Sequence, residues 1–412
     1  MTQEIDVLII GGGAAGIGAA RRLANTGLVT RVLEASARLG GRACTHEIAG
    51  LALDLGCGWL HSADRNGWVE VARERRIDID RSKAAWGAQF RNLDFSPAEQ
   101  SEAWSAFDSW TKRLSKSPPP SDSAADALEP HQKWNDHIRA IAGYISGATL
   151  ERLSAVDYAA YDEASSEDNW RARTGYGALI AQGYPANVAL SLATPVESLA
   201  IDTGFVKAIT RAGDIRARAV ILTVSTAVLA GDTLRLPTAL DPWRDAARRL
   251  PLGLNEKLFL EIHGDAPFED ETHVTGNPRD PMTASYYIRP FGWPVIECYF
   301  GAARAQRLCE DGLEAGFAFA IDQLVRLFGS DVRPTLRPLL GSNWARMPRI
   351  GGAYSYALPG HANARKALAQ PFDGRVFFAG EATSDVDFST AHGALDSGVR
   401  AATEAIAALS RP

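Results

Sequence analysis

Alternating apolar and glycine-rich stretches at the start of the chain predict a strand, a helix and a second strand. Ile5–Ile10 is an apolar run that ends at Gly11, Gly12 and Gly13, as a buried strand that enters a tight turn does. Residues 14–24 are rich in alanine and arginine and predict a helix, and residues 29–33 predict the next strand. This order indicates an α/β fold.

The rest of the chain predicts a helical insertion followed by a β-rich part. From about 97 to 173, apolar residues recur at helical spacing, interrupted by the loop "SKSPPPSDSAADALEP". Residues 198–224 predict hairpins that lead into a buried strand at 219–224. Further strands are expected at 254–262, 293–300 and 376–378, and helices at 315–328 and 390–409. No internal repeat is evident.

Composition narrows the classes of function. With 412 residues, 46% of them hydrophobic, two domains are expected. The net charge of −6 gives no basic excess of the kind that binds nucleic acid or an anionic membrane surface, so small molecules are the expected partners.

The start of the chain and its cysteines bear on where the protein is expected to work. The first residues lack a basic segment followed by a longer apolar run and a cleavage site, and no apolar stretch approaches the roughly 20 residues that span a bilayer. Cys44, Cys57, Cys298 and Cys309 show no metal-binding spacing. We therefore expect a soluble, cytoplasmic protein in a reducing compartment, without a metal site.

The glycine loop after the first strand predicts a dinucleotide site. Gly11, Gly13 and Gly16 form a G-x-G-x-x-G motif between strand and helix, so backbone N–H groups and the helix dipole can face a pyrophosphate. Glu34 ends the second strand, where its carboxylate can accept hydrogen bonds from ribose hydroxyls and repel a 2′-phosphate. The motif alone leaves nicotinamide and flavin open.

The segment "RLGGRACT" (38–45) favours a flavin. Arg38 and Arg42 surround a glycine pair and can reach the pyrophosphate and the ribityl chain. "VLEASARLGGR" resembles the flavin-binding signature of the flavin-dependent amine oxidases, which include monoamine oxidases, polyamine oxidases, amino-acid oxidases and histone-lysine demethylases. The resemblance continues in the family's order through "LDLGCGWLHS" (53–62), "ARAVILTVSTAVL" (217–229), "NEKLFLE" (255–261), "WARMPRIGGAYSY" (344–356) and "FAGEATSDVDFSTAHGALDSG" (378–398). Only about 83–173 matches loosely.

This resemblance implies an α/β fold with an α+β substrate part, in which two domains are interleaved along the chain. A Rossmann-like FAD-binding domain would comprise 1–80, 175–245 and 370–412. A substrate-binding domain would comprise the mainly helical 81–174 and the mixed sheet of 246–369.

The resemblance also implies the residues that contact noncovalent FAD. Val196 would meet the adenine through its backbone, Trp344 the edge of the isoalloxazine, and Glu381 the ribityl chain. The helix N-terminus at Thr390 would point at the pyrimidine end of the flavin, where its N–H groups stabilise developing negative charge. The expected cofactor-binding set is Gly11, Gly13, Ala14, Ala15, Gly16, Glu34, Ala35, Arg38, Gly41, Arg42, Gly56, Cys57, Gly58, Trp59, Val196, Trp344, Gly380, Glu381, Thr390 and Ala391.

The catalytic candidate is Lys257. From the strand pattern alone it would be a solvated lysine, but the resemblance implies a lysine that holds a water against flavin N5. Ala353 stands where covalent monoamine oxidases have the cysteine that forms a thioether with the flavin, so the FAD is expected to be noncovalent.

The aromatic walls of the substrate pocket are only half present. Tyr354 would form one wall beside the substrate nitrogen, whereas Thr390 stands where monoamine oxidases place the second aromatic. Phe388, Trp59 and His61 are the possible replacements. This departure disfavours a simple arylalkyl monoamine and leaves room for a bulkier or polyamine-like substrate.

The remaining charged and titratable residues leave two interpretations open. An acidic run either attracts a polycationic substrate or is a solvated helix face or loop; it comprises Asp157, Asp162, Glu163, Glu167 and Asp168. The eight histidines are scattered without motif spacing, and only His61 and His392 fall in segments expected near the flavin.

The expected reaction is oxidation of an amine C–N bond to an imine, with hydride transfer to flavin N5, reoxidation by O2 to H2O2, and hydrolysis of the imine. The expected partners are thus a small-molecule amine and O2, with no nucleic acid and no membrane, for a monomer or homodimer. The alternatives are a flavin-dependent desaturase, isomerase or dehydrogenase that acts on a non-amine or uses another electron acceptor, and a protein that binds FAD without turnover.

Overall fold

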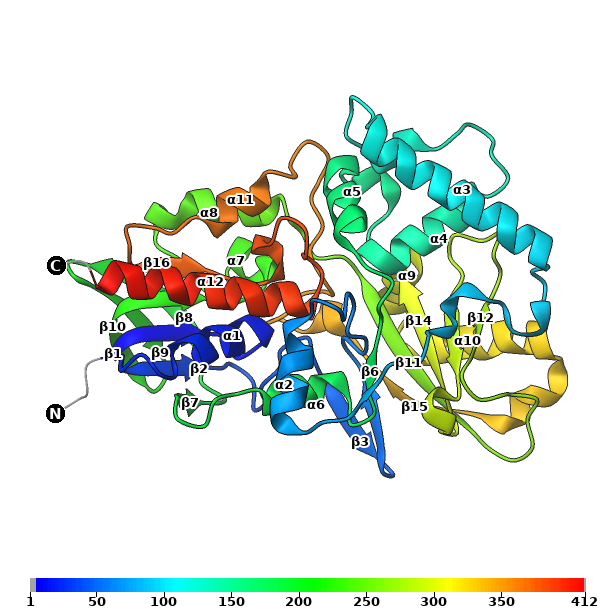
Figure 1. Cartoon of the computed structure of the whole chain (residues 1–412), viewed down its shortest axis with the longest axis horizontal. Helices are drawn as coiled ribbons and strands as arrows, with labels where there is room; N and C mark the ends of the chain where they lie inside the picture. The colour runs from blue at the N-terminus through cyan, green and yellow to red at the C-terminus, as the bar shows by residue number, and fades with distance from the viewer. Residues whose placement is uncertain (1–4, 411–412) are drawn as a thin grey trace.

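Two β-sheets with helices around them make up the chain (Figure 1). The computed structural model describes residues 5–410. One sheet has seven strands and mixed direction, the other has five, and two short two-stranded ribbons accompany them. The expected mixed α/β architecture is confirmed. No helix within 5–410 is long and apolar enough to cross a membrane.

The seven-stranded sheet is parallel through its centre and antiparallel at one edge. Its order is β7-β2-β1-β10-β9-β8, with β16 also paired to β10. Strands β1, β2, β7, β10 and β16 run parallel, while β8, β9 and β10 form an antiparallel meander. The strands are β1 (Ile5–Ile10), β2 (Thr30–Leu33), β7 (Ala189–Ser191), β8 (Val196–Asp202), β9 (Phe205–Thr210), β10 (Gly213–Leu222) and β16 (Val376–Phe378).

Strand β10 corrects one prediction. The hairpin strand and the buried strand expected at 219–224 are one continuous strand that ends at Leu222. Its first half pairs with β9 and is partly exposed, and its last three residues pair with β16 while β1 lies along its other edge. One strand can do both because its pattern changes from alternating to uniformly apolar where neighbours and helices cover both of its faces.

Alternate residues of the central strands pack on helices on opposite faces of this sheet. Val7 and Ile9 face α1 (Ala14–Leu23) and α12 (Ala391–Leu409). Leu8 and Ile10 face the other layer, which comprises α7 (Thr226–Ala230), α8 (Asp241–Arg248) and α11 (Ala364–Ala369). Helices α2 (Gly67–Arg75) and α6 (Tyr176–Gln182) extend the layer formed by α1 and α12. The sheet is therefore buried on both faces, as parallel sheets are.

Helices α1 and α12 lie side by side (Figure 1) because small residues let their backbones approach. A Cβ on Gly18 would lie 2.4 Å from the carbonyl oxygen of Leu395, and one on Gly398 would lie 2.0 Å from that of Ala15. Any larger residue at either position would force the helices apart. This explains why the C-terminal segment is built from small residues.

The five-stranded sheet is antiparallel and presents one polar face. Its order is β12-β13-β14-β11-β15. Leu258 of β11 and Cys298 of β14 face the apolar core under α9 and α10, so Lys257 and Glu297, their neighbours in sequence, face the opposite side. The elements are β11 (Asn255–Ile262), β12 (Thr272–Thr275), β13 (Ser285–Ile288), β14 (Val295–Gly301), β15 (Leu336–Gly341), α9 (Ala302–Asp311) and α10 (Leu313–Phe328). The ribbons pair β3 (Thr45–Ile48) with β4 (Leu51–Asp54) and β5 (Ile79–Asp80) with β6 (Arg171–Ala172).

The predicted helical insertion is confirmed. It consists of α3 (Pro97–Lys116), α4 (Asn135–Ser146) and α5 (Ala155–Ala164), which pack around large buried aromatics such as Trp110 and Trp134. The predicted loop between α3 and α4 is shorter than expected, because α3 extends to Lys116 and Ala124–Ala127 form a 3₁₀ turn.

A buried ion pair joins this insertion to the seven-stranded sheet. Both carboxylate oxygens of Asp157, on α5, accept hydrogen bonds from Arg365, on α11, at 2.6 and 2.8 Å. The two residues are 2% and 1% exposed. Arg365 also donates to Ser355 Oγ at 2.9 Å. The pair therefore holds α5 of the insertion against the segment from Ser355 to Arg365.

We expect Asp157→Ala to lower the free energy of unfolding by about 3–5 kcal/mol, because it leaves the charge of Arg365 buried without its carboxylate partner. Urea unfolding followed by fluorescence measures this. The matched control is Asp245→Ala, which removes a pair to Arg248 whose aspartate side chain is 60% exposed; it should cost about 0–1 kcal/mol. Equal effects of the two substitutions would contradict the assigned role.

Candidate active site

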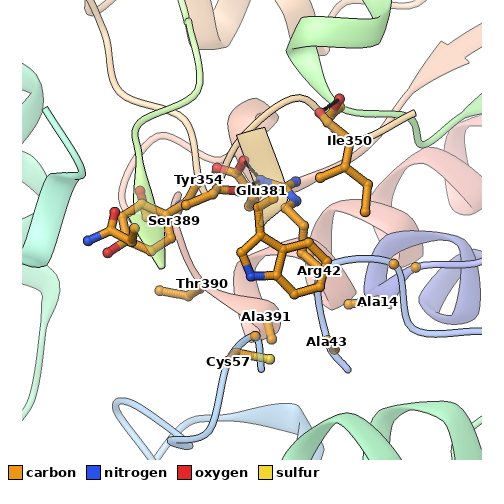
Figure 2. Close-up of a pocket in the computed structure, with 18 of the residues that line it drawn as sticks. Ala14, Arg42, Ala43, Cys57, Ile350, Tyr354, Glu381, Ser389, Thr390 and Ala391 are labelled. Atoms are coloured by element: carbon orange, nitrogen blue, oxygen red, sulfur yellow. Dashed lines mark hydrogen bonds and ion pairs between the residues drawn. The ribbon is translucent and has the colours of Figure 1, made fainter. Parts of the chain in front are cut away.

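A large cavity runs between the two sheets and has a volume of about 1350 Å³. This exceeds the roughly 300–1,000 Å³ of a pocket for a drug-sized ligand, so it can hold a long cofactor together with a second molecule. It extends from Glu34 and Val196, beside the seven-stranded sheet, to Lys257 on the five-stranded sheet and onward to the helical insertion. In Figure 2, Tyr354 and Thr390 lie toward one side of the view and Ala14 toward the other.

The glycine loop brings the start of α1 to the cavity wall. Gly13 is the N-cap of α1 and offers no side chain to bond the first-turn N–H groups. Ala14 and Ala15 line the cavity. The free N–H groups of this turn need an acceptor from outside the helix, which a phosphate would provide.

The third glycine of the motif serves packing and does not line the cavity. A Cβ on Gly16 would lie 1.9 Å from the carbonyl oxygen of Gly11, so only glycine lets α1 pack so closely on the strand. Gly16 was predicted to contact the cofactor, but it packs against Gly11 on the side of the loop away from the cavity.

Glu34 and Arg38 both line the cavity, and both already form hydrogen bonds to neighbouring residues of the protein. Glu34 Oε2 accepts from the Gly12 N–H at 2.6 Å, and its Oε1 accepts from the N–H and hydroxyl of Ser36 at 2.7 Å each. Arg38 donates to three backbone carbonyls, which belong to Leu39, Gly41 and Ala43. Glu34 keeps lone pairs for a ribose hydroxyl, whereas Arg38 braces the turn.

Arg42 and Glu381 form an ion pair in the cavity wall, with Nη1 and Oε1 2.9 Å apart. Glu381 is buried and also accepts from Ser355 Oγ at 2.7 Å and from the Ser389 N–H at 2.9 Å. Burial acts to raise the pKa of Glu381, but Arg42 and Arg365 outweigh it and hold the pKa below its ordinary value. Glu381 is therefore a carboxylate at neutral pH.

Glycines and a neutral thiol form the wall near Lys257. A Cβ on Gly56 would lie 1.7 Å from the Arg42 carbonyl oxygen, and one on Gly58 would lie 3.1 Å from Lys257 Nζ. Between them, burial raises the pKa of the Cys57 thiol to about 12, so the thiol stays protonated. Trp344 also lines the cavity and donates from Nε1 to the Leu55 carbonyl at 3.0 Å. Backbone and flat side chains thus leave room for a planar group. Ala35, Gly41, Val196, Gly380 and Ala391 line the cavity as well.

Lys257 is a buried residue of this cavity, 6% exposed, which excludes the solvated interpretation. Its Nζ lies 2.9 Å from Glu297 Oε1, without a well-aligned hydrogen bond. The buried carboxyl of Asp54 lies nearby; burial raises the pKa of Asp54, and Thr45 and Lys257 partly counteract this. The Lys257 side chain therefore lies close to two carboxyl groups.

Tyr354 belongs to a set of hydrogen-bonded tyrosines. Its hydroxyl lies 2.8 Å from that of Tyr299, on β14, and donates to the Tyr144 carbonyl at 2.5 Å. All three tyrosines line the cavity. Burial raises the pKa of Tyr354 and of Tyr299, so both remain protonated donors.

Sequence reasoning missed Glu297 and Tyr299, although the sequence contains a signal for them. They alternate with apolar residues in β14, and the antiparallel register places Tyr299 opposite Lys257. A glutamate in so apolar a strand indicates a polar partner on the same face. Identifying that partner required the strand pairing.

Trp59, His61 and Thr390 line the cavity, whereas Phe388 is not among its lining residues. The ring of Phe388 packs on the Arg365 guanidinium, 3.5 Å from the ring centroid, and this placement corrects the prediction. Thr390 caps α12 by accepting from the Gly393 N–H at 2.9 Å. His61 Nδ1 lies 2.6 Å from Asn169 Oδ1, and burial lowers the pKa of His61.

The acidic run divides into different environments. Asp157 is buried in its ion pair, Asp162 lines the cavity but is exposed, and the other three acids are exposed on the surface. His392 lines the cavity with Nε2 3.2 Å from Asp387 Oδ1. Within residues 5–410 no three histidine, cysteine, aspartate or glutamate side chains are grouped to hold a metal ion.

The dependence of the free energy of unfolding on acidic pH should show how much ionised Glu381 stabilises the protein. Its folded-state pKa lies below the unfolded value of about 4.3, so ionised Glu381 stabilises the protein above that pH, and the contribution disappears as the pH falls through the folded-state pKa. We expect the stability gap between wild type and Glu381→Gln to be constant from pH 8 to about 5 and to narrow below about 4.3. Urea midpoints across this range measure the gap. Glu129→Gln, at an exposed ion pair, is the control and should show a small gap throughout; a Glu381 gap independent of pH would contradict this.

The cavity fits FAD on the geometry of the chain itself. It has an uncapped helix N-terminus for phosphate, a carboxylate at the end of β2 for ribose, and a wall of glycine backbone for a flat ring. These features occur in one continuous space, so a single extended ligand can use them all.

Comparison with known proteins also indicates a flavin-binding protein. Residues 14–406 match the family described as flavin containing amine oxidoreductase. Polyamine oxidase 4 of Oryza sativa subsp. japonica is 26% identical over 97% of this chain and 88% of its own length. Pseudooxynicotine dehydrogenase of a Pseudomonas species is 25% identical over 96% and 85%, and the human peroxisomal N(1)-acetyl-spermine/spermidine oxidase is 23% identical over 96% and 94%.

Proposed function

Because the chain belongs to the flavin-containing amine oxidoreductases, we propose that it oxidises an amine C–N bond to an imine, with O2 as electron acceptor and H2O2 as product. Water then hydrolyses the imine to a carbonyl compound and releases the nitrogen as ammonia or, from a substituted amine, as an amine. The protein is a flavin-dependent amine oxidoreductase, and its cofactor is FAD. The observation that carries the proposal is the buried Lys257, in the wall of the cavity that the start of α1 also faces.

The cofactor would lie along a Rossmann-like domain built from 1–80, 175–245 and 370–412, with 81–174 and 246–369 supplying the substrate side. The glycine loop lies at the carboxyl end of β1, where α/β sheets bind dinucleotides. The α1 N-terminus would hold the phosphates, and Glu34 the ribose. Arg42 would hold the ribityl chain, since Glu381 fixes its guanidinium in the cavity wall.

FAD, when bound, supplies the site that accepts the hydride from the carbon next to the amine nitrogen. The residues of the chain would orient the substrate for this transfer. The ring of Tyr354 would flank the nitrogen, with its hydroxyl held by Tyr144 and Tyr299. Lys257 would hold a water molecule between the substrate and Glu297, where the pair can take up and return protons during imine hydrolysis.

Substitution of Lys257 by methionine tests this role. In stopped-flow absorbance, a panel of polyamines, arylalkylamines, amino acids and cyclic amines should bleach the bound flavin anaerobically, and peroxide should form when air is admitted. We expect Lys257→Met to slow one of the two half-reactions about 10²-fold, the lower range for proton-transfer groups. Lys366→Met, at a lysine whose side chain is 68% exposed, should change neither. Unchanged half-reactions in Lys257→Met would refute the assignment, and bleaching without peroxide would identify another acceptor.

The flavin should be released completely when the protein is denatured. Ala353 cannot form a thioether, and the cavity-lining thiol of Cys57 stays protonated because burial raises its pKa. Acid precipitation should therefore leave all the yellow colour in the supernatant, with the absorbance spectrum of free FAD. Colour retained by the precipitated chain would contradict a noncovalent cofactor.

A further inference from the structure

The helical insertion adds an apolar chamber to the cavity beyond Lys257. We call this the aromatic chamber and define it by Phe95, Trp104, Phe107, His137, Ile141 and Ile145, all of which line the cavity. These residues come from α3, α4 and the segment before α3, where the sequence resembles the family only loosely.

The aromatic chamber offers no free carboxylate to a cation. On the substrate side of the cavity the lining carboxylates within 5–410 are Glu297 and Asp162. Glu297 is paired with Lys257, and Asp162 is exposed to solvent. A polyamine would have to leave a further ammonium group in the chamber without a countercharge, and aromatic faces compensate only part of the desolvation of so strongly hydrated a group.

One polar group in the chamber has no partner. His137 is 1% exposed, and neither ring nitrogen has a hydrogen-bond partner within the described residues. Its neighbours are rings, with centroids 5.6 Å away in both Phe95 and Trp104. Burial lowers the pKa of His137 to about 4, so the ring is neutral at physiological pH and carries one donor and one acceptor.

From these contacts we propose that the substrate has a single cationic amine, an aromatic or heteroaromatic body that fills the aromatic chamber, and a neutral hydrogen-bonding group at its far end that pairs with His137. This rests on the proposed amine oxidation and names its substrate class. It reverses the preference drawn from the missing second aromatic wall, because that expectation took no account of the aromatic chamber. An aromatic body packs against the rings of the chamber, and the distal group satisfies an imidazole that is otherwise buried unpaired.

The experiment compares three probes with the holoenzyme under anaerobic conditions: pyridylbutylamine, phenylbutylamine and spermidine. The measured quantity is the second-order rate constant for flavin bleaching. We expect pyridylbutylamine to exceed phenylbutylamine about tenfold, and both to exceed spermidine by more. If no probe bleaches the flavin but another amine does, or if spermidine is fastest, this inference is overturned while amine oxidation stands. If no amine of any class bleaches it, the proposed function fails with it.

Variants separate the role of His137 from general packing. His137→Phe should remove the preference for pyridyl over phenyl, and His137→Asn, which keeps a donor and an acceptor, should retain part of it. His263→Phe, at an exposed histidine outside the cavity, should leave the preference unchanged. Ile141→Glu adds a carboxylate to the chamber and should raise the rate with spermidine at least tenfold. A pyridyl preference that persists in His137→Phe, in protein with full FAD content, would refute the pairing.

Discussion

The structure depends on one network of charges and hydrogen bonds, buried except at Arg42, that links Arg42 through Glu381 and Ser355 to Arg365 and Asp157. Buried ions are tolerated only when every partner is present, because desolvation of an unpaired charge is costly. Ser355, Arg365 and Glu381 belong to the C-terminal part of the protein, Arg42 to the glycine-rich turn and Asp157 to the helical insertion, so folding must bring these three parts together at once. The cavity is the space that remains between segments held in this way.

The two ends of the cavity are built by different means. Beside the seven-stranded sheet the wall consists of backbone, glycines and helix N-termini, which suit a cofactor whose shape does not vary. Beside the five-stranded sheet and the helical insertion the wall consists of side chains, many of them aromatic. Side chains can be exchanged without rebuilding the backbone, so specificity for the amine can change while the cofactor site stays the same.

The sequence could predict the features that depend on local patterns, but not those that depend on contacts between distant segments. The strand–helix–strand unit, the glycine loop and the cap at Thr390 are local patterns, and the corresponding elements are confirmed. The partner of Lys257 depends on the pairing of β11 with β14, which no local pattern contains. Phe388 was misplaced for a related reason, since the side on which its ring packs is decided by Arg365, which becomes its neighbour only through the buried ion pair.

Gly18 and Gly398 show how far the cofactor site extends beyond the cavity. Neither residue lines the cavity, yet the carbonyl contacts they permit set the spacing of α1 and α12, and with it the positions of the two helix N-termini that the cofactor would meet. The absence of two side chains would therefore contribute to the affinity for FAD. A survey of positions that cause loss of flavin would identify residues that no inspection of ligand contacts could reveal.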